Sequence, residues 1–391
     1  MSGSSGLRVG LNLIFMTAAA GGAGRYAREL IPAMLELDPK LHVTAFASRD
    51  LPRTVLEEPW AGEIEWVRYP HASASRRALV AQMVELPRAA AQRKLDVVHS
   101  PANIGLLGTR GAANVVTLLD LIWLHRETSP LGQRGRLRAK LLFVRCARAA
   151  DRVLTISEAT KRDLVATLGL ESDRIDVTPL AVADRESPAT PEADLRTRLA
   201  LGSAPFVLCV AQKQPHKNLE SLIRAIERAP EAALVLAGAR EAHEDRLREL
   251  AGRNGVAERV HFVDWVDDAD LEGLYRAARC FVLPSLVEGF GLPLLEAMRH
   301  GLPVACSDRS SLPEVVGDAA LLFDPTDQEA VTTAVLRLVR DEALRRDLSE
   351  RGRDRARLFS WSRTAAETVA SYRRAISARA ARRRFRRVRS P

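Results

Sequence analysis

The chain has few cysteines: there are four in 391 residues, and no two of them are close in sequence. Without a C-x-x-C pair, the sequence offers neither a zinc knuckle nor a redox motif. Each cysteine falls in an apolar run, where a free thiol packs as a small hydrophobe, a pattern that favours a reducing compartment. The chain also lacks an apolar run of the ~18 residues that a membrane span needs, and a recognisable signal peptide. We therefore expect a cytoplasmic protein that does not cross a membrane.

Acidic residues are absent from the C-terminal end. Residues 373–391 carry nine arginines and no acid, whereas the rest of the chain has 49 basic and 49 acidic residues. The net charge of +9 is thus a local feature. It is poor evidence for nucleic-acid binding, and we expect no nucleic-acid partner. The basic segment is either a solvated tail or a contact with anionic membrane headgroups, so a peripheral location on the inner face of a membrane stays open.

Short apolar runs alternate with longer amphipathic segments along most of the chain. Apolar residues make up 47% and charged residues 27%, as in globular proteins. The alternation predicts parallel sheets covered by helices on both faces. We therefore expect an α/β fold with two doubly wound, Rossmann-like domains that face a central cleft. The expected strands are at residues 7–15, 42–47, 96–99, 115–118, 153–156 and 175–178, and then at 206–210, 233–237, 260–263, 280–283 and 304–307.

The alternation lapses where Pro188, Pro191 and Gly202 indicate a linker with a short helix. This lapse sets the domain boundaries. We predict an N-terminal domain at 1–183, a linker at 184–203, a C-terminal domain at 204–361, a C-terminal helix at 362–378 and an Arg-rich tail at 379–391.

The strongest candidate site follows the strand predicted at 280–283. The chain there reads PSLVEGFGLPLLEAM over residues 284–298. Gly289 and Gly291 allow the backbone to approach a ligand closely, and Pro293 suits the first turn of a helix. The N–H groups of this turn are then expected to point out of a helix N-terminus, which is a ready anion site.

Two carboxylates, Glu288 and Glu296, flank this turn. A phosphate repels a carboxylate, so we expect both to face the neutral hydroxyls of a sugar. The plain alternative is a strand, a glycine turn and a helix with a capping acid. The run E-G-F-G-L-P-L-L-E-A-M resembles the E-x7-E signature of the retaining glycosyltransferases of family 4, which have the GT-B fold.

The resemblance extends over most of the chain. Further blocks of the family, in the same order, are similar to residues 96–101, 151–158, 274–278 and 310–319. The resemblance implies transfer of a sugar from a nucleotide-sugar donor with retention of the anomeric configuration. It implies no metal and no cofactor, because the nucleotide sugar is a co-substrate.

The resemblance also implies roles for the glycine turn and its two glutamates. Glu288 is the candidate catalytic residue and positions the donor sugar through its hydroxyls, and Glu296 binds the nucleotide ribose. The donor diphosphate is bound by the turn, which comprises Gly289, Phe290, Gly291 and Leu292.

Lysine is scarce, with six in the chain, yet Lys213 and Lys217 both follow the strand predicted at 206–210. Basic side chains in such a loop can neutralise phosphates; the alternative is a pair of solvated surface lysines. The run P-H-K-N at 215–218 resembles the family's donor-diphosphate loop, which has a basic residue at the position of Lys217. Lys213 is a second candidate for the same role.

A glycine-rich loop joins the first strand to the first helix and reads AAAGGAGRY over residues 18–26. It is not a G-x-G-x-x-G with a following acid, so a dinucleotide site is weakly supported. It resembles the family's first-domain glycine loop, in which Gly21 and Gly22 would close over the donor phosphates and the acceptor. The alternative is a tight turn with close helix–strand packing.

One position departs from the family pattern. Many members read V-T-x-H-D-L after the fourth strand, whereas this chain has Leu119 at the histidine position. Three explanations compete: Asp120 or His125 covers the role, the role is dispensable, or activity is weakened. His99 is a weaker alternative, and we assign no catalytic histidine.

The sequence thus predicts a retaining hexosyltransferase, with mannose favoured as the sugar. The acceptor is expected to be a glycan or a polyprenyl-linked sugar in the synthesis of a surface polysaccharide or glycoconjugate. One rival is a dehydrogenase or epimerase on the same architecture, which the missing dinucleotide fingerprint opposes. Another is a degenerate GT-B binding protein that its basic tail tethers to a membrane or to nucleic acid.

Overall fold

The computed structural model describes residues 6–18, 21–122, 133–183, 188–264 and 266–388. The chain divides into two compact units. The first comprises the described residues up to 122, from 133 to 180 and from 361 onward; the second comprises those from 181 to 360. In these described ranges, no helix is both long enough and apolar enough to span a bilayer.

The first unit is built on a parallel sheet whose strand order is β3-β2-β1-β4-β5-β6-β7. Val9 of β1 pairs with Val43 of β2 on one side and with Val97 of β4 on the other. Central strands such as β4 and β5 are buried along their whole length, as expected when helices cover both faces of a sheet. The strands are β1 (Arg8–Leu13), β2 (His42–Ala47), β3 (Glu65–Arg68), β4 (Val97–Ser100), β5 (Ala113–Leu118), β6 (Arg152–Thr155) and β7 (Ile175–Val177).

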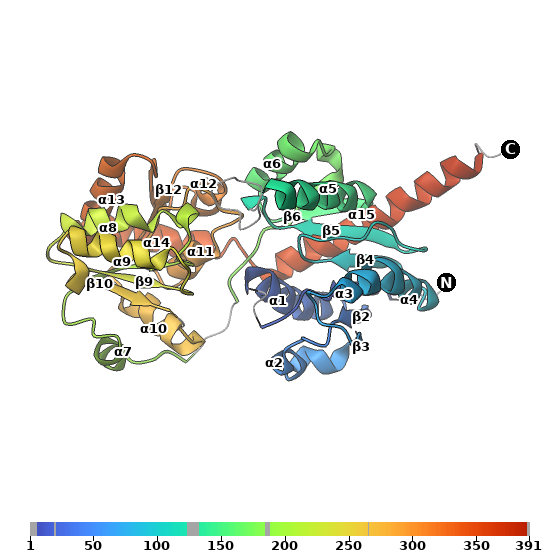
Figure 1. The fold of residues 1–391 in the computed structure, drawn as a ribbon, viewed down its shortest axis with the longest axis horizontal. Coiled ribbons are helices and arrows are strands. Elements are labelled where there is room, and N and C mark those ends of the chain that lie inside the picture. The colour runs from blue at the N-terminus through green and yellow to red at the C-terminus, as the bar shows by residue number, and fades with distance from the viewer. Residues whose placement is uncertain (1–5, 19–20, 123–132, 184–187, 265, 389–391) are drawn as a thin grey trace. The chain divides into compact units, whose positions relative to one another are not determined.

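Helices flank this sheet (Figure 1). In chain order they are α1 (Gly21–Leu37), α2 (Arg53–Leu56), α3 (Arg76–Val80), α4 (Leu86–Gln92), α5 (Gln133–Ala149), α6 (Glu158–Leu168) and, from the end of the chain, α15 (Trp361–Val388). The last helix packs on α1 and on β5 and β6. The C-terminal segment is therefore part of the first unit.

The second unit has a parallel sheet in the order β10-β9-β8-β11-β12-β13. Its strands are β8 (Phe206–Val210), β9 (Ala233–Ala237), β10 (Val260–Val263), β11 (Cys280–Leu283), β12 (Val304–Ser307) and β13 (Ala320–Phe323). Its helices are α7 (Glu192–Arg198), α8 (Leu219–Glu227), α9 (Glu244–Arg253), α10 (Asp268–Ala277), α11 (Leu292–Arg299), α12 (Leu312–Val316), α13 (Gln328–Arg340) and α14 (Glu342–Ala356). The α/β prediction with two doubly wound sheets is confirmed.

Two strands of these sheets are absent from the sequence prediction. β3 and β13 each lie at a sheet edge and each have only four residues. β3 begins and ends on a charged residue, so it lacks the continuous apolar run by which a buried parallel strand is recognised. β13 is the apolar run ALLF, so its sequence does carry that signal and the prediction missed it.

The C-terminal helix is longer than predicted. We expected a helix at 362–378 and a separate tail from 379, but α15 continues to Val388. No glycine or proline interrupts this run before the last residue, and alanine and arginine are strong helix formers. Arg379, assigned to the tail, is instead a docking residue: its guanidinium lies 3.1 Å from a carboxylate oxygen of Asp151.

The four cysteines are free and buried. Burial raises the pKa of the Cys146 thiol to about 11 and that of Cys209 to about 12. The thiols therefore stay protonated and pack as small apolar groups, as the sequence predicts.

Candidate functional site

The predicted site residues of the second unit lie around the point where the strand order of its sheet reverses. The chain runs outward from β8 through β9 to β10, and then returns to the other side of β8 with β11. In open parallel sheets, ligands bind at the carboxyl ends of the strands at such a reversal. Lys217 follows β8 and Glu288 follows β11, so the topology brings these two residues together.

Lys217 and Glu288 form an ion pair. The Lys217 Nζ donates to Glu288 Oε1 at 2.7 Å, and the Ser285 hydroxyl donates to the same oxygen at 2.8 Å. The side chains of Lys217 and Glu288 are only 15% and 11% exposed. A charge-assisted hydrogen bond in such a shielded place is stronger than one at the surface. Lys217 and Glu288 were predicted from separate motifs, and the structure shows that they are in direct contact.

Backbone and hydroxyl contacts fix the loop that carries Lys217 and the loop that carries Glu288 in position. The Leu286 N–H donates to the His216 carbonyl at 2.8 Å. The hydroxyls of Ser310 and Ser311 donate to the Glu288 carbonyl at 2.6 and 3.0 Å. No role was predicted for these serines, although they fall in a block that resembles the family. They follow β12, which pairs with β11, and this neighbouring position is the feature that could have indicated a contact with Glu288.

The glycine turn leads into α11 with the geometry that its sequence suggests. Gly291 precedes the helix with φ at 98°, and a Cβ there would lie 2.6 Å from Leu312 Cδ2. Only glycine suits both conditions. The first N–H groups of a helix have no partner within the helix, and the helix dipole favours an anion at this end. The Phe290 ring is buried and packs against Phe359, so only its backbone can contribute to such a site.

Glu296 lies on α11, eight residues after Glu288. Its side chain is buried, and the Tyr275 hydroxyl donates to its Oε2 at 2.7 Å. A buried carboxylate needs such a donor. Tyr275 falls in the family-like block 274–278, but its bond to Glu296 was not predicted, because nothing in the spacing between α10 and α11 shows which side chains meet.

Lys213 does not behave as predicted. Its side chain is fully buried, and its Nζ donates to the Val263 carbonyl at 2.8 Å and to the Gly238 carbonyl. It also lies 3.6 Å from a Glu244 carboxylate oxygen and 3.5 Å from one of Asp264. Burial lowers the pKa of Lys213, and the two carboxylates oppose that shift.

These contacts correct the assignment of Lys213 to the diphosphate. Protein acceptors from the ends of β9 and β10 enclose the ammonium group, so it is withdrawn from a ligand. Its contacts join three neighbouring loops instead. Sequence position alone does not tell whether a lysine in a loop points outward or inward.

Gly21 and Gly22 begin α1 in the first unit. Both are exposed, and a Cβ at either position would meet nothing within 4 Å. The alternative of close helix–strand packing is therefore wrong for these two glycines. Gly21 has φ at 51°, which favours glycine. Their contact with donor and acceptor stays a prediction.

His99 is unsuited to act as a base. It is fully buried, and its two ring nitrogens lie 2.7 Å from the Tyr372 hydroxyl and 2.7 Å from the Thr117 hydroxyl. Burial lowers the pKa of His99 to about 3, so the ring is neutral at physiological pH. His99 belongs to the core of the first unit.

The remaining candidates lie after β5. The Leu119 N–H donates to Asn103 Oδ1 at 2.7 Å. Asp120 Oδ1 accepts a hydrogen bond from the Ile122 N–H at 3.2 Å, as in a local turn. His125 lies outside the described residues. Among the described residues, neither His99 nor the segment that follows β5 up to residue 122 offers a histidine for the role that many family members give to this position.

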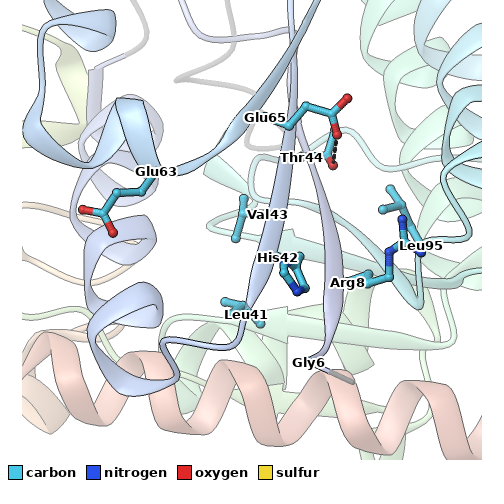
Figure 2. Close-up of a pocket in the computed structure, with 9 residues that line it drawn as sticks. All are labelled: Gly6, Arg8, Leu41, His42, Val43, Thr44, Glu63, Glu65 and Leu95. Carbon is cyan, nitrogen blue, oxygen red and sulfur yellow. Dashed lines mark hydrogen bonds between the residues drawn. The ribbon is translucent and has the colours of Figure 1, made fainter. Parts of the chain in front are cut away.

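A cavity of about 450 Å³ opens at the end of the first sheet where β1, β2 and β3 begin, opposite the end at which the loop after β5 carries Leu119 (Figure 2). Its lining comprises Gly6, Arg8, Leu41, His42, Val43, Thr44, Glu63, Glu65 and Leu95. The Glu65 carboxylate is already engaged by the Thr44 hydroxyl at 3.0 Å and by Arg93 at 2.9 Å. Because this is the amino end of the strands, we do not assign the reaction to it.

The part of the chain that the structure describes contains no group of three His, Cys, Asp or Glu side chains that could hold a metal ion. At the candidate site the described residues supply positive charge through Lys217 and through the dipole at the N-terminus of α11.

Two family models match the sequence, one over each half of the chain. Residues 20–185 match a model described as Glycosyltransferase Family 4, and residues 193–355 match one described as Glycosyl transferases group 1. O-antigen chain mannosyltransferase B of Escherichia coli is 36% identical over 231 residues, which are 57% of this chain and 61% of that protein. MMP alpha-(1->4)-mannosyltransferase of Mycolicibacterium hassiacum is 33% identical over 243 residues, 60% of this chain and 56% of that protein. The matched part thus spans less than two thirds of either relative.

Solved structures share the whole architecture. Sucrose-phosphate synthase of Thermosynechococcus elongatus superposes with a TM-score of 0.74 at 23% identity, over 95% of this chain and 100% of that one. This likeness concerns the fold, whereas the two sequence models concern the family. The chain belongs to glycosyltransferase family 4, and its two parallel sheets are those of the GT-B fold.

Proposed function

We propose that this protein transfers a hexose, with mannose favoured, from a nucleoside diphosphate sugar to a glycan or polyprenyl-linked acceptor, with retention of configuration and without a metal. The observation that carries the proposal is the Lys217–Glu288 pair at the strand-order reversal of the second sheet. The names of the two mannosyltransferase relatives support the choice of sugar. Surface polysaccharide or glycoconjugate synthesis is the setting that such acceptors suggest.

The pair provides the chemistry that this reaction needs. The bond between the anomeric carbon and the diphosphate breaks, so negative charge develops on the leaving group. Lys217 carries a full positive charge and the N-terminus of α11 a partial one, and preorganised charges of this kind stabilise a developing anion without reorganising. The Lys217 Nζ is paired with Glu288 Oε1 at 2.7 Å. We infer that a donor phosphate replaces this contact, which frees Glu288 to accept hydrogen bonds from the donor sugar.

Retention follows if the acceptor attacks from the face that the diphosphate leaves. A new bond forms between the acceptor oxygen and the anomeric carbon, and the acceptor proton passes to the departing phosphate oxygen. This route uses no protein base, so it accommodates Leu119 at the usual histidine position and the buried, neutral His99. Glu296 binds the ribose, and Gly21 and Gly22 leave the start of α1 open to donor and acceptor.

A transfer assay tests the proposal. The protein is incubated with GDP-mannose, UDP-glucose and other nucleotide sugars in turn, with mannosides and polyprenyl-linked sugars as acceptors. We expect product from GDP-mannose, an α-linkage by NMR, and undiminished turnover in EDTA. A β-linked product would contradict retention, and loss of turnover in EDTA would contradict metal independence. A chain that releases no nucleoside diphosphate from any donor would be a degenerate member of the family.

A further inference from the structure

Helices α10 and α11 are joined by a hydrogen bond to which the proposed reaction assigns no role. Tyr275, on α10, donates its hydroxyl proton to Glu296 Oε2 across 2.7 Å. Tyr275 is 3% exposed and Glu296 is 6% exposed. A hydrogen bond to a charged group is worth more than one between neutral groups, particularly when water is excluded. This contact is therefore a strong constraint on the Glu296 carboxylate.

A second set of contacts fixes Tyr275 itself. Glu296 and His300 are four residues apart, so they lie on the same face of the helix end. The His300 ring stacks on the Tyr275 ring, with centroids 5.6 Å apart and planes at 11°. The His300 Nε2 lies 3.2 Å from Glu272 Oε1, which is one turn before Tyr275 on α10. The phenol is thus held against α11 by its ring as well as by its hydroxyl.

We propose that Tyr275 is a positioning residue that orients Glu296 toward the donor ribose, and so sets the preference for a ribose that carries its hydroxyls. This inference rests on the proposed ribose-binding role of Glu296. A carboxylate is planar, so fixing Oε2 also fixes the direction of Oε1. A preorganised acceptor binds a hydroxyl pair without first losing side-chain freedom. A glutamate without the Tyr275 bond has to be ordered by the ligand itself.

The test compares nucleotides with and without ribose hydroxyls. GDP and 2′,3′-dideoxy-GDP, and the corresponding UDP pair, are titrated by calorimetry into the wild-type chain and into Tyr275→Phe and Glu296→Gln. The phenylalanine keeps the ring that stacks on His300. Tyr69→Phe is the matched control, because the Tyr69 hydroxyl is buried in the first unit and has no hydrogen-bond partner there among the described residues. Thermal unfolding of each variant verifies that it is folded.

We expect the wild type to bind the ribonucleotide about tenfold more tightly than the dideoxy form, in line with one or two hydrogen bonds to a charged group. Glu296→Gln and Tyr275→Phe should each reduce this ratio to about twofold or less, and Tyr69→Phe should leave it unchanged. With donor sugar, Tyr275→Phe should raise KM while changing kcat less than twofold.

The possible results separate the inference from the function beneath it. If Glu296→Gln loses the ratio but Tyr275→Phe keeps it, Tyr275 does not position the carboxylate and the inference fails while the function stands. If Glu296→Gln keeps the full ratio, Glu296 does not bind ribose, so its proposed ribose-binding role and the inference about Tyr275 both fail. If a folded wild-type chain binds neither GDP nor UDP, the proposed donor class is itself wrong.

Discussion

Each lysine near the candidate site has a different function because its surroundings differ. Lys217 has one carboxylate partner and remains partly exposed. Lys213, four residues earlier, is completely buried between two carbonyls and two carboxylates. Lys217 can exchange its carboxylate partner for a phosphate. Lys213 cannot, because turning toward a ligand would leave buried carbonyl groups without a hydrogen-bond donor. At the scale of single residues, a lysine can therefore bind a ligand only where the protein groups around it can be replaced by that ligand.

The structural role of Lys213 predicts a loss of stability. We expect Lys213→Met to lower the free energy of unfolding by about 3 kcal/mol, because the carbonyls of Gly238 and Val263 lose their donor and the buried Glu244 carboxylate keeps only Arg248 as an ion-pair partner. The double variant Lys213→Met/Glu244→Gln should recover part of this loss. Urea denaturation measures both. A Lys213→Met chain that is as stable as the wild type but no longer binds donor would restore the diphosphate assignment.

The buried His99 predicts a pH dependence of stability. Its pKa is about 3 in the folded chain against an ordinary value of 6.5. Between these values the unfolded chain binds a proton that the folded chain does not, so stability falls as the pH falls from about 6.5 toward 3. His99→Gln should have a shallower decline over this range in urea denaturation at a series of pH values. Equal slopes for the two chains would contradict the assignment of a neutral His99.

At the scale of elements, α15 is a structural part of the first unit. It docks on α1 and the sheet, and its charged residues reach carboxylates of that unit. Asp151 is the main partner near its C-terminal half: the guanidinium of Arg379 lies 3.1 Å from it and that of Arg382 lies 3.6 Å from it. Asp151 also accepts the Asn114 N–H at 2.9 Å. The helix is thus anchored at a carboxylate that is only 4% exposed.

Removing this anchor should loosen the helix end. We expect Asp151→Asn to lower the free energy of unfolding by about 2 kcal/mol, as for the loss of a hydrogen bond to a charged group, and to speed hydrogen exchange over residues 375–388. Asp347→Asn is the control, since Asp347 pairs with Arg351 at the surface with both side chains about half exposed; such pairs contribute about 0–1 kcal/mol. Unchanged exchange in Asp151→Asn would show that apolar packing alone holds α15.

The central elements were predictable from the sequence, and the reasons lie in their burial. Apolar runs such as Phe206–Val210 are buried on both faces, so they read clearly as strands. The segment from Glu288 to Glu296 was recognised from its glycines and carboxylates. Three features were not: the direction of Lys213, the bond from Tyr275 and the serines behind Glu288. Each depends on which side chains meet across the fold, and no local pattern encodes that.

At the scale of the whole molecule, the excess charge is concentrated at one end of the chain. Five arginines follow Arg382: Arg383, Arg384, Arg386, Arg387 and Arg389. Arg379 is not included among the charges that could contact a membrane, because it is paired with Asp151. We propose that this end contacts an anionic membrane surface, where each basic residue contributes about 1 kcal/mol.

Vesicle sedimentation tests this contact. Replacing the five arginines with glutamine keeps the chain length and the Asp151 anchor. We expect binding to vesicles with anionic lipid to fall at least tenfold, and binding of either chain to neutral vesicles to be weak. Undiminished binding of the variant to anionic vesicles would exclude this end as the anchor.

The central claim is that the Lys217–Glu288 pair receives the donor diphosphate, and calorimetric titration of GDP-mannose tests it most directly. Removing a preorganised charge of this kind costs about 100- to 1,000-fold in stabilisation of the developing anion. We expect Lys217→Met to weaken donor binding at least tenfold and to lower kcat/KM by about that larger factor. Lys40→Met, which changes an exposed lysine of the first unit, should bind donor like the wild type. Full donor affinity in a folded Lys217→Met chain would contradict the account.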